Sequence, residues 1–223
     1  MPSGLVGVSS KQFAELQAKA NSQLVESCPL SSPSISNSNL VPSRVVPKAP
    51  APPLPSGNYD PAKAVRIATD PTILVPPPGA RKTPEEVAPL LPPMIPPSKM
   101  PKGTDPTYNC CANFVSAVLI NAGAPIVHTT SAPQLEQELY AAKWTNGNIS
   151  DPKPGDVVML SEYDAKSNSW IPAHTELVSG PGDWLVGSND KTVNGKLLPQ
   201  VIGIDRISWA PPNYRVTVLT PPK

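Results

Sequence analysis

One cysteine, one histidine and one asparagine have the types and the order that a site for nucleophilic catalysis requires. Such a site needs a thiol that ionises readily and a base that takes up its proton and returns it. Cys111 lies in the first turn of a helix expected over residues 108–122, and the amino end of a helix favours a thiolate. His174 begins an expected strand, and Asn189 ends the next strand along the chain. We therefore expect Cys111 as nucleophile, His174 as base and Asn189 as the acceptor that orients the imidazole.

Other polar residues near these positions have competing or simpler interpretations. Asp190 and Glu176 are alternatives to Asn189, because a carboxylate also accepts a hydrogen bond from an imidazole. His128 follows the first expected helix in a polar loop, and we expect it on the surface. Asp156 is expected to belong to a turn and to take no part in the chemistry.

The chain has three cysteines, Cys28, Cys110 and Cys111, and two histidines. An odd number of cysteines, two of them adjacent, is a poor disulfide framework, so we expect reduced thiols. We interpret Cys28 and Cys110 as packing residues or bystanders. Because histidines are few and no CxxC motif occurs, a structural zinc site is not expected. The sequence predicts neither a metal ion nor another cofactor.

The elements that must position these residues follow residue 107. The helix over 108–122 has a wide apolar face and is expected to end at Gly123. Ser131 is expected to begin a second helix, with Gln134 as its capping partner. Apolar runs separated by turn residues then predict a series of strands, DVVMLS, HTELVSG, DWLVGS, VIGIDRI and YRVTVLT. Helices followed by an antiparallel meander predict an α+β domain over residues 107–223.

The first half of the chain has a different composition. Of the 33 prolines, 22 precede Thr107. Proline removes a backbone donor and fixes φ, so we expect residues 29–106 to form an extended arm rich in polyproline II. Residues 1–28 are expected to form a docking segment with a short helix over 9–27, which would be marginal by itself.

Charge and hydropathy exclude several classes of partner. The net charge is +1, and the Lys and Arg residues are scattered, so we expect no nucleic-acid partner. The first residues lack the basic and apolar regions of a signal peptide. No apolar run has the length needed to span a bilayer. We therefore expect a protein made in a cytoplasm, without an export or anchoring signal of its own.

Four segments, in the correct order, resemble the NlpC/P60 and CHAP cell-wall peptidases over residues of about 107–220. The run NCCANFVSAVLINAGA resembles their nucleophile helix and places Cys111 at the nucleophile position, with Phe114 three residues later. The run PKPGDVVML resembles their turn into the first central strand. The run AHTELVSG resembles the strand that begins with the catalytic histidine, here His174. The run VGSND resembles the polar third position, here Asn189.

This resemblance implies a papain-like cysteine hydrolase, an endopeptidase or an amidase, that cleaves bacterial peptidoglycan. A polar third position of this kind occurs in phage-encoded members. The resemblance therefore implies a virion-associated enzyme, made in the host cytoplasm and attached to phage tail or baseplate proteins through residues 1–106. The chain departs from the family pattern at Ala112 and Asn113, and it lacks the upstream Tyr of NlpC/P60 enzymes, so the match favours the CHAP side.

Two other functions stay open on the sequence. A structural or adaptor protein of a phage tail, with an inactive hydrolase-like domain, agrees with the long arm and with the departures beside the nucleophile. A cysteine amidase or peptidase that acts on a protein substrate is the third interpretation.

Overall fold

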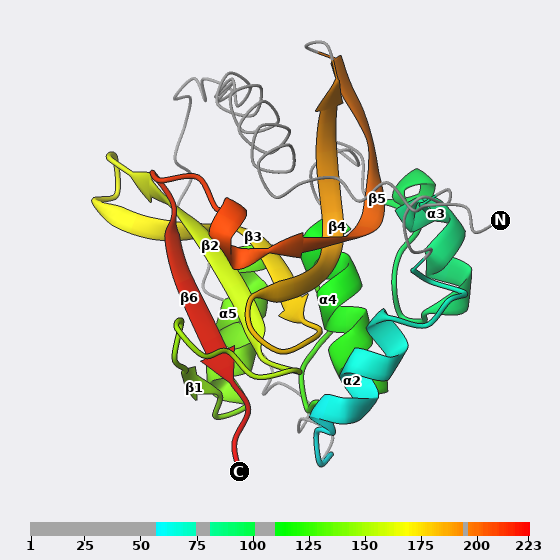
Figure 1. Ribbon diagram of the computed structural model, residues 1–223, viewed down its shortest axis with the longest axis horizontal. Helices are drawn as coiled ribbons and strands as arrows, with labels where there is room; N and C mark the ends of the chain where they lie inside the picture. Colours follow the sequence, from blue (N-terminus) through cyan, green and yellow to red (C-terminus); the bar gives the residue numbers. More distant parts are fainter. Residues whose placement is uncertain (1–56, 75–80, 101–109, 194–195) are drawn as a thin grey trace, which may run out of the picture. The chain divides into compact units, whose positions relative to one another are not determined.

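The structure, a computed structural model, describes residues 57–74, 81–100, 110–193 and 196–223. All of these residues belong to one of the two compact units of the chain, Leu54–Lys223. The other unit, Met1–Pro53, lies outside the described residues, and so does the helix expected over 9–27. Figure 1 shows how the elements of the described part are arranged.

Two helices follow the expected pattern closely. The described residues form the α-helices α2 (Pro61–Ala68), α3 (Pro84–Val87), α4 (Cys110–Asn121) and α5 (Ala132–Ala141), and the 3-10 helices η1 (Ala88–Leu90), η2 (Pro97–Lys99) and η3 (Ile207–Trp209). The end of α4 at Gly123 is confirmed, because this glycine has a φ of 95°. The cap of α5 at Ser131 is confirmed too, since its side chain accepts a hydrogen bond from the Gln134 N–H at 3.4 Å. The reciprocal half of a capping box is not formed, because the Ser131 N–H donates to Oγ1 of Thr129 at 3.0 Å.

A six-stranded antiparallel sheet forms the second layer. Its strands are β1 (Thr145–Asn146), β2 (Val157–Asp164), β3 (Ser169–Val178), β4 (Trp184–Val193), β5 (Lys196–Arg206) and β6 (Arg215–Thr220). They lie in the order β1-β6-β2-β3-β4-β5. The expected α+β class with an antiparallel sheet is therefore confirmed. The last strand differs from a simple meander, because β6 pairs with the buried strand β2 instead of following β5.

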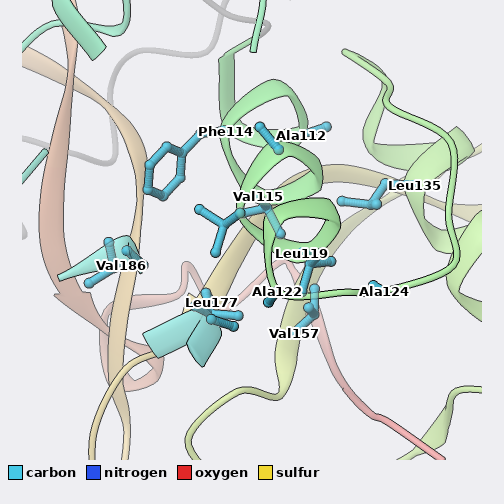
Figure 2. Packing of buried hydrophobic residues seen from close by; sticks show 14 of the residues in the cluster. Ala112, Phe114, Val115, Leu119, Ala122, Ala124, Leu135, Val157, Leu177 and Val186 are labelled. Atoms are coloured by element: carbon cyan, nitrogen blue, oxygen red, sulfur yellow. The ribbon is translucent and has the colours of Figure 1, made fainter. Parts of the chain in front are cut away.

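The main core lies between α4 and the sheet. Phe114, Val115 and Leu119 are fully buried against residues of β3 and β4, which include Leu177 and Val186 (Figure 2). All ten residues of α4 from position 110 to 119 are buried, on every side of the helix. A helix that is apolar all round requires cover on the side away from the sheet.

That cover comes from residues 57–74 and 81–100, which lie within the span expected to be an extended arm. They form α2, α3, η1 and η2 instead. Their buried side chains in the core are Ala64, Ala68, Ile73, Leu74, Val87, Ala88, Leu91 and Met94. The Asp60 N–H donates to the Ala122 carbonyl at 2.9 Å, and the Tyr59 ring lies 5.0 Å from that of Trp144. These segments are part of the folded unit.

The prolines explain why the expectation differs from the structure. Pro61, Pro84 and Pro97 each occupy the first position of a helix. At that position the missing N–H would have no intrahelical partner in any case, and the fixed φ suits a helix. A proline-rich composition is therefore compatible with short helices that begin at proline.

Candidate active site

The divergence of β3 from β4 positions the candidate base and its partner. In the described part of the chain the two strands pair at Leu177–Val186 and Val178–Leu185. The same register, continued by three residues, brings His174 opposite Asn189. The two side chains meet there, since Nε2 of His174 lies 3.1 Å from Oδ1 of Asn189. The structure thus brings together two of the three residues expected from the sequence.

A buried carboxylate shares the same ring nitrogen. Oε1 of Glu176 lies 3.0 Å from Nε2 of His174, and the Glu176 side chain is fully buried. Its other oxygen, Oε2, has no hydrogen-bond partner among the described residues. A buried carboxylate is costly without a positive partner, so Glu176 favours the imidazolium form of His174. The side chain of Asp190, the other alternative, lies outside the part of the chain that the structure describes.

Cys111 completes the group. It is the second residue of α4 and 3% exposed, and it lies close enough to His174 for its charge to raise the pKa of the imidazole. Burial lowers the pKa of His174. The charge and hydrogen bond of Cys111, together with those of Glu176, outweigh this effect and hold the pKa of the imidazole well above its usual range. The His174 side chain keeps one fifth of its surface exposed, which gives the group access to solvent.

A buried glutamine ties the start of α4 to the sheet. Oε1 of Gln200 accepts hydrogen bonds from the Cys110 N–H at 3.2 Å and from the Ser188 hydroxyl at 2.9 Å. Gln200 is 4% exposed, and Cys110 is fully buried. Sequence reasoning did not identify Gln200, because nothing in the run LLPQVIG marks it as a site residue.

Two glycines make room for charged side chains, the buried Glu176 and the exposed Arg81. Gly187 of β4 and Gly203 of β5 are paired across the sheet. A Cβ at Gly187 would lie 2.6 Å from Cγ of Glu176, and a Cβ at Gly203 would lie 2.9 Å from Nη1 of Arg81. Glu176 therefore reaches His174 by lying across the backbone of β4, where a side chain would obstruct it.

A second carboxylate lies behind Asn189. The Nδ2 group of Asn189 donates a hydrogen bond to Oδ2 of Asp205. Burial, followed by the nearby Glu176 charge, raises the pKa of Asp205 to about 7, although Arg81 and His174 oppose the shift. Sequence reasoning did not identify Asp205 either, because it is distant in the chain from the other residues.

The departure from the family pattern at Asn113 has a structural role. Asn113 is fully buried, accepts a hydrogen bond from the Ile95 N–H at 2.9 Å and donates one to the Ile95 carbonyl at 2.7 Å. Its Oδ1 also lies 2.9 Å from Nε2 of His128. His128 is therefore half-buried, and the expectation of a surface position is wrong. Asn113, two residues after Cys111, therefore joins α4 to the covering segment 81–100.

Asp156 lies in the expected turn. Its carboxylate accepts a hydrogen bond from the Lys153 N–H at 2.8 Å. Among the described residues, no group of three or more His, Cys, Asp and Glu side chains is placed to hold a metal ion. No helix formed by those residues has both the length and the apolar character needed to cross a membrane.

Comparisons with known proteins add no relative. No protein-family model, no curated protein and no solved structure matches this chain. A candidate function therefore has two supports, the geometry of Cys111, His174, Glu176 and Asn189 and the resemblance of the four segments.

Proposed function

We propose that this chain is a papain-like cysteine hydrolase that cleaves peptide or amide bonds of bacterial peptidoglycan. The observation that carries the proposal is the position of His174. Its ring lies close enough to Cys111 for the sulfur to raise the pKa of the imidazole, and its Nε2 lies within hydrogen-bond distance of both Glu176 and Asn189. A nucleophile, a base and an orienting acceptor are the parts that covalent acyl transfer needs.

The chemistry follows from these positions. The Cys111 thiolate attacks the carbonyl carbon of the scissile bond, and the backbone N–H of Cys111 stabilises the oxyanion. The N–H of Cys110 is already donated to Gln200. The leaving amine takes a proton from the His174 imidazolium as the C–N bond breaks, which leaves a thioester. His174 then removes a proton from water, the water oxygen attacks the thioester, and the C–S bond breaks to release the carboxylic product and restore the Cys111 thiolate beside the His174 imidazolium.

The substrate is chosen on the resemblance to cell-wall peptidases. The same resemblance supports a virion-associated enzyme of a phage, held on the tail by its N-terminal region. Because residues 57–74 and 81–100 contribute to the core, we assign attachment to residues 1–56, which lie outside the described part of the chain.

The test is digestion of purified peptidoglycan by the full chain, with separation of the soluble fragments and their identification by mass spectrometry. We expect new amino and carboxyl ends at one type of bond, and no release above background by Cys111→Ser. Cys110→Ser is the matched control and should release fragments like the wild type. Absence of fragments from the wild type across several wall types would favour the alternative, a tail structural or adaptor protein with an inactive domain.

A further inference from the structure

The side-chain amide of Asn189 works in the candidate site in only one of its two orientations. Its oxygen must face His174, because the ring N–H of an imidazolium can only donate a hydrogen bond. The amide group has nearly the same shape when it is turned over, so a second contact must distinguish oxygen from nitrogen. The carboxylate of Asp205 makes that contact, since it accepts a hydrogen bond from Nδ2 of Asn189.

The contact between Asn189 and Asp205 depends on a bend in the sheet. By register, Asp205 pairs with Leu185, four residues before Asn189 on β4. Four residues of straight strand span about 13 Å, which is too far for a direct hydrogen bond. Figure 1 shows that β4 and β5 bend strongly together. The paired glycines Gly187 and Gly203 lie between the two positions, where the absence of side chains permits the approach.

We propose that Asp205 is a positioning residue that fixes the Asn189 amide with its oxygen toward His174. The proposal deepens the proposed function and depends on it for its catalytic meaning. The order of contacts is then Asp205 to Asn189, Asn189 to His174, and His174 to Cys111. Asp205 touches neither the nucleophile nor the base in this chain of contacts, so it acts through Asn189.

Three charged side chains influence the ionisation of Asp205. Glu176 disfavours its ionised form, whereas Arg81 and His174 favour it, and burial leaves its pKa at about 7. Below this pH the neutral carboxyl group of Asp205 resembles an amide. Above it the charge strengthens the hydrogen bond that Asn189 donates, so the amide is held more firmly with its oxygen toward His174. The contribution of Asp205 is therefore expected to increase as the pH rises through about 7.

The experiment measures the iodoacetamide labelling rate of Cys111 by peptide mass spectrometry, from about pH 5 to about pH 9, and peptidoglycan release beside it. Asp205→Asn keeps an acceptor for Asn189 and loses the charge, whereas Asp205→Leu loses both. We expect Asp205→Leu to slow labelling by about tenfold, and Asp205→Asn to recover most of that loss. The ratio of the wild-type labelling rate to that of Asp205→Asn should be near one at low pH and should rise with a midpoint near 7.

A double variant tests whether Asp205 acts through Asn189. Asp205→Leu combined with Asn189→Ala should label no more slowly than Asn189→Ala alone. The proposal would be overturned if the two substitutions together slowed labelling by the product of their separate effects. It would also be overturned if the ratio of the wild-type labelling rate to that of Asp205→Asn were constant with pH. If Asp205→Leu does not fold, the pH dependence of Asp205→Asn decides. The expected labelling pattern without peptidoglycan release would contradict the proposed function and leave the role of Asp205 in place.

Discussion

At the scale of residues, the candidate site contains more buried charge than a Cys–His–Asn group requires. His174 contacts a carboxylate and an amide through one nitrogen, and a second carboxylate lies beyond the amide. An ionised acceptor forms a stronger hydrogen bond than a neutral one. Glu176 is therefore expected to stabilise the imidazolium more than Asn189 does, and Asn189 is expected to set the direction of the ring.

This ranking gives the first prediction. Glu176→Gln should lower the raised pKa of His174 toward its usual value, and it should reduce Cys111 labelling at mildly acidic pH by about tenfold for each unit of lowering. Asn189→Ala should reduce labelling less. Labelling profiles of both variants against pH measure the difference, with Glu162→Gln as the control, since Glu162 is a half-buried glutamate of β2 whose carboxylate accepts a hydrogen bond from the Tyr214 hydroxyl. If Asn189→Ala reduced Cys111 labelling at acidic pH more than Glu176→Gln does, Asn189 and not Glu176 would be the main stabiliser of the imidazolium.

The same raised pKa predicts how stability depends on pH. The folded state binds a proton at His174 more tightly than the unfolded state does. The resulting stabilisation is fully present below about pH 6.5 and is lost as the pH rises through the raised pKa of the folded state. Urea unfolding at several pH values should show this loss in the wild type and a smaller loss in His174→Gln. If the free energy of unfolding changed equally with pH in the two proteins, the stabilisation assigned to the His174 proton would be contradicted.

At the scale of elements, the site is formed where two strands separate and a helix begins. β3 and β4 bring His174 and Asn189 together, and Gln200 of β5 holds the first N–H of α4. Gly187 of β4 leaves room for the buried Glu176 side chain, whose Cγ would lie 2.6 Å from a Cβ at that position. These features connect the position of Cys111 to the geometry of three strands.

Gly187 provides the test at this scale. Gly187→Ala should displace Glu176, because the added Cβ would lie 2.6 Å from its Cγ. We expect a stability loss of about 1–3 kcal/mol from the overlap, together with loss of acid-pH labelling of Cys111. Gly180→Ala, before β4, is the matched control, since its Cβ would meet nothing closer than Cβ of Trp184 at 3.6 Å. Similar labelling of the two variants and the wild type would contradict the role assigned to Gly187.

Sequence patterns predicted the elements better than they predicted the site. The cap of α5, the end of α4 and the strand runs were readable because capping residues and apolar periodicity act locally. Cys111, His174 and Asn189 were identifiable by type and order. Gln200 and Asp205 were not, because their roles come from the register and bend of β4 and β5, which no local pattern encodes.

At the scale of the whole molecule, the main change concerns the proline-rich first half. Residues 57–74 and 81–100 cover the face of α4 that the sheet leaves open. Prolines at helix starts gave this region the composition of an extended arm. The smallest unit that should fold therefore begins before α2, near Leu54, and not near residue 102.

Truncation tests this boundary. A chain that begins at Leu54 should unfold cooperatively with the stability of the full chain. A chain that begins at residue 102 loses Ile73, Leu74, Leu91 and Met94 from the core. Each such side chain contributes about 1.5–3 kcal/mol when buried, so their sum approaches the whole stability of an ordinary domain. Loss of the cooperative transition in calorimetry is expected. If a chain that begins at residue 102 unfolded cooperatively and still labelled rapidly at Cys111, the cover described for α4 would be contradicted.

The central claim is that His174 activates the sulfur of Cys111, and thiol labelling tests it without knowledge of the substrate. Dilute iodoacetamide at about pH 6 leaves an ordinary thiol, with a pKa of about 8.5, almost wholly protonated and unreactive. We predict rapid labelling at Cys111 in the wild type and in Cys110→Ser. The rapid labelling should disappear in Cys111→Ser and slow strongly in His174→Ala. Equal slow labelling of Cys28, Cys110 and Cys111 in the wild type would contradict it and leave a fold without an activated nucleophile.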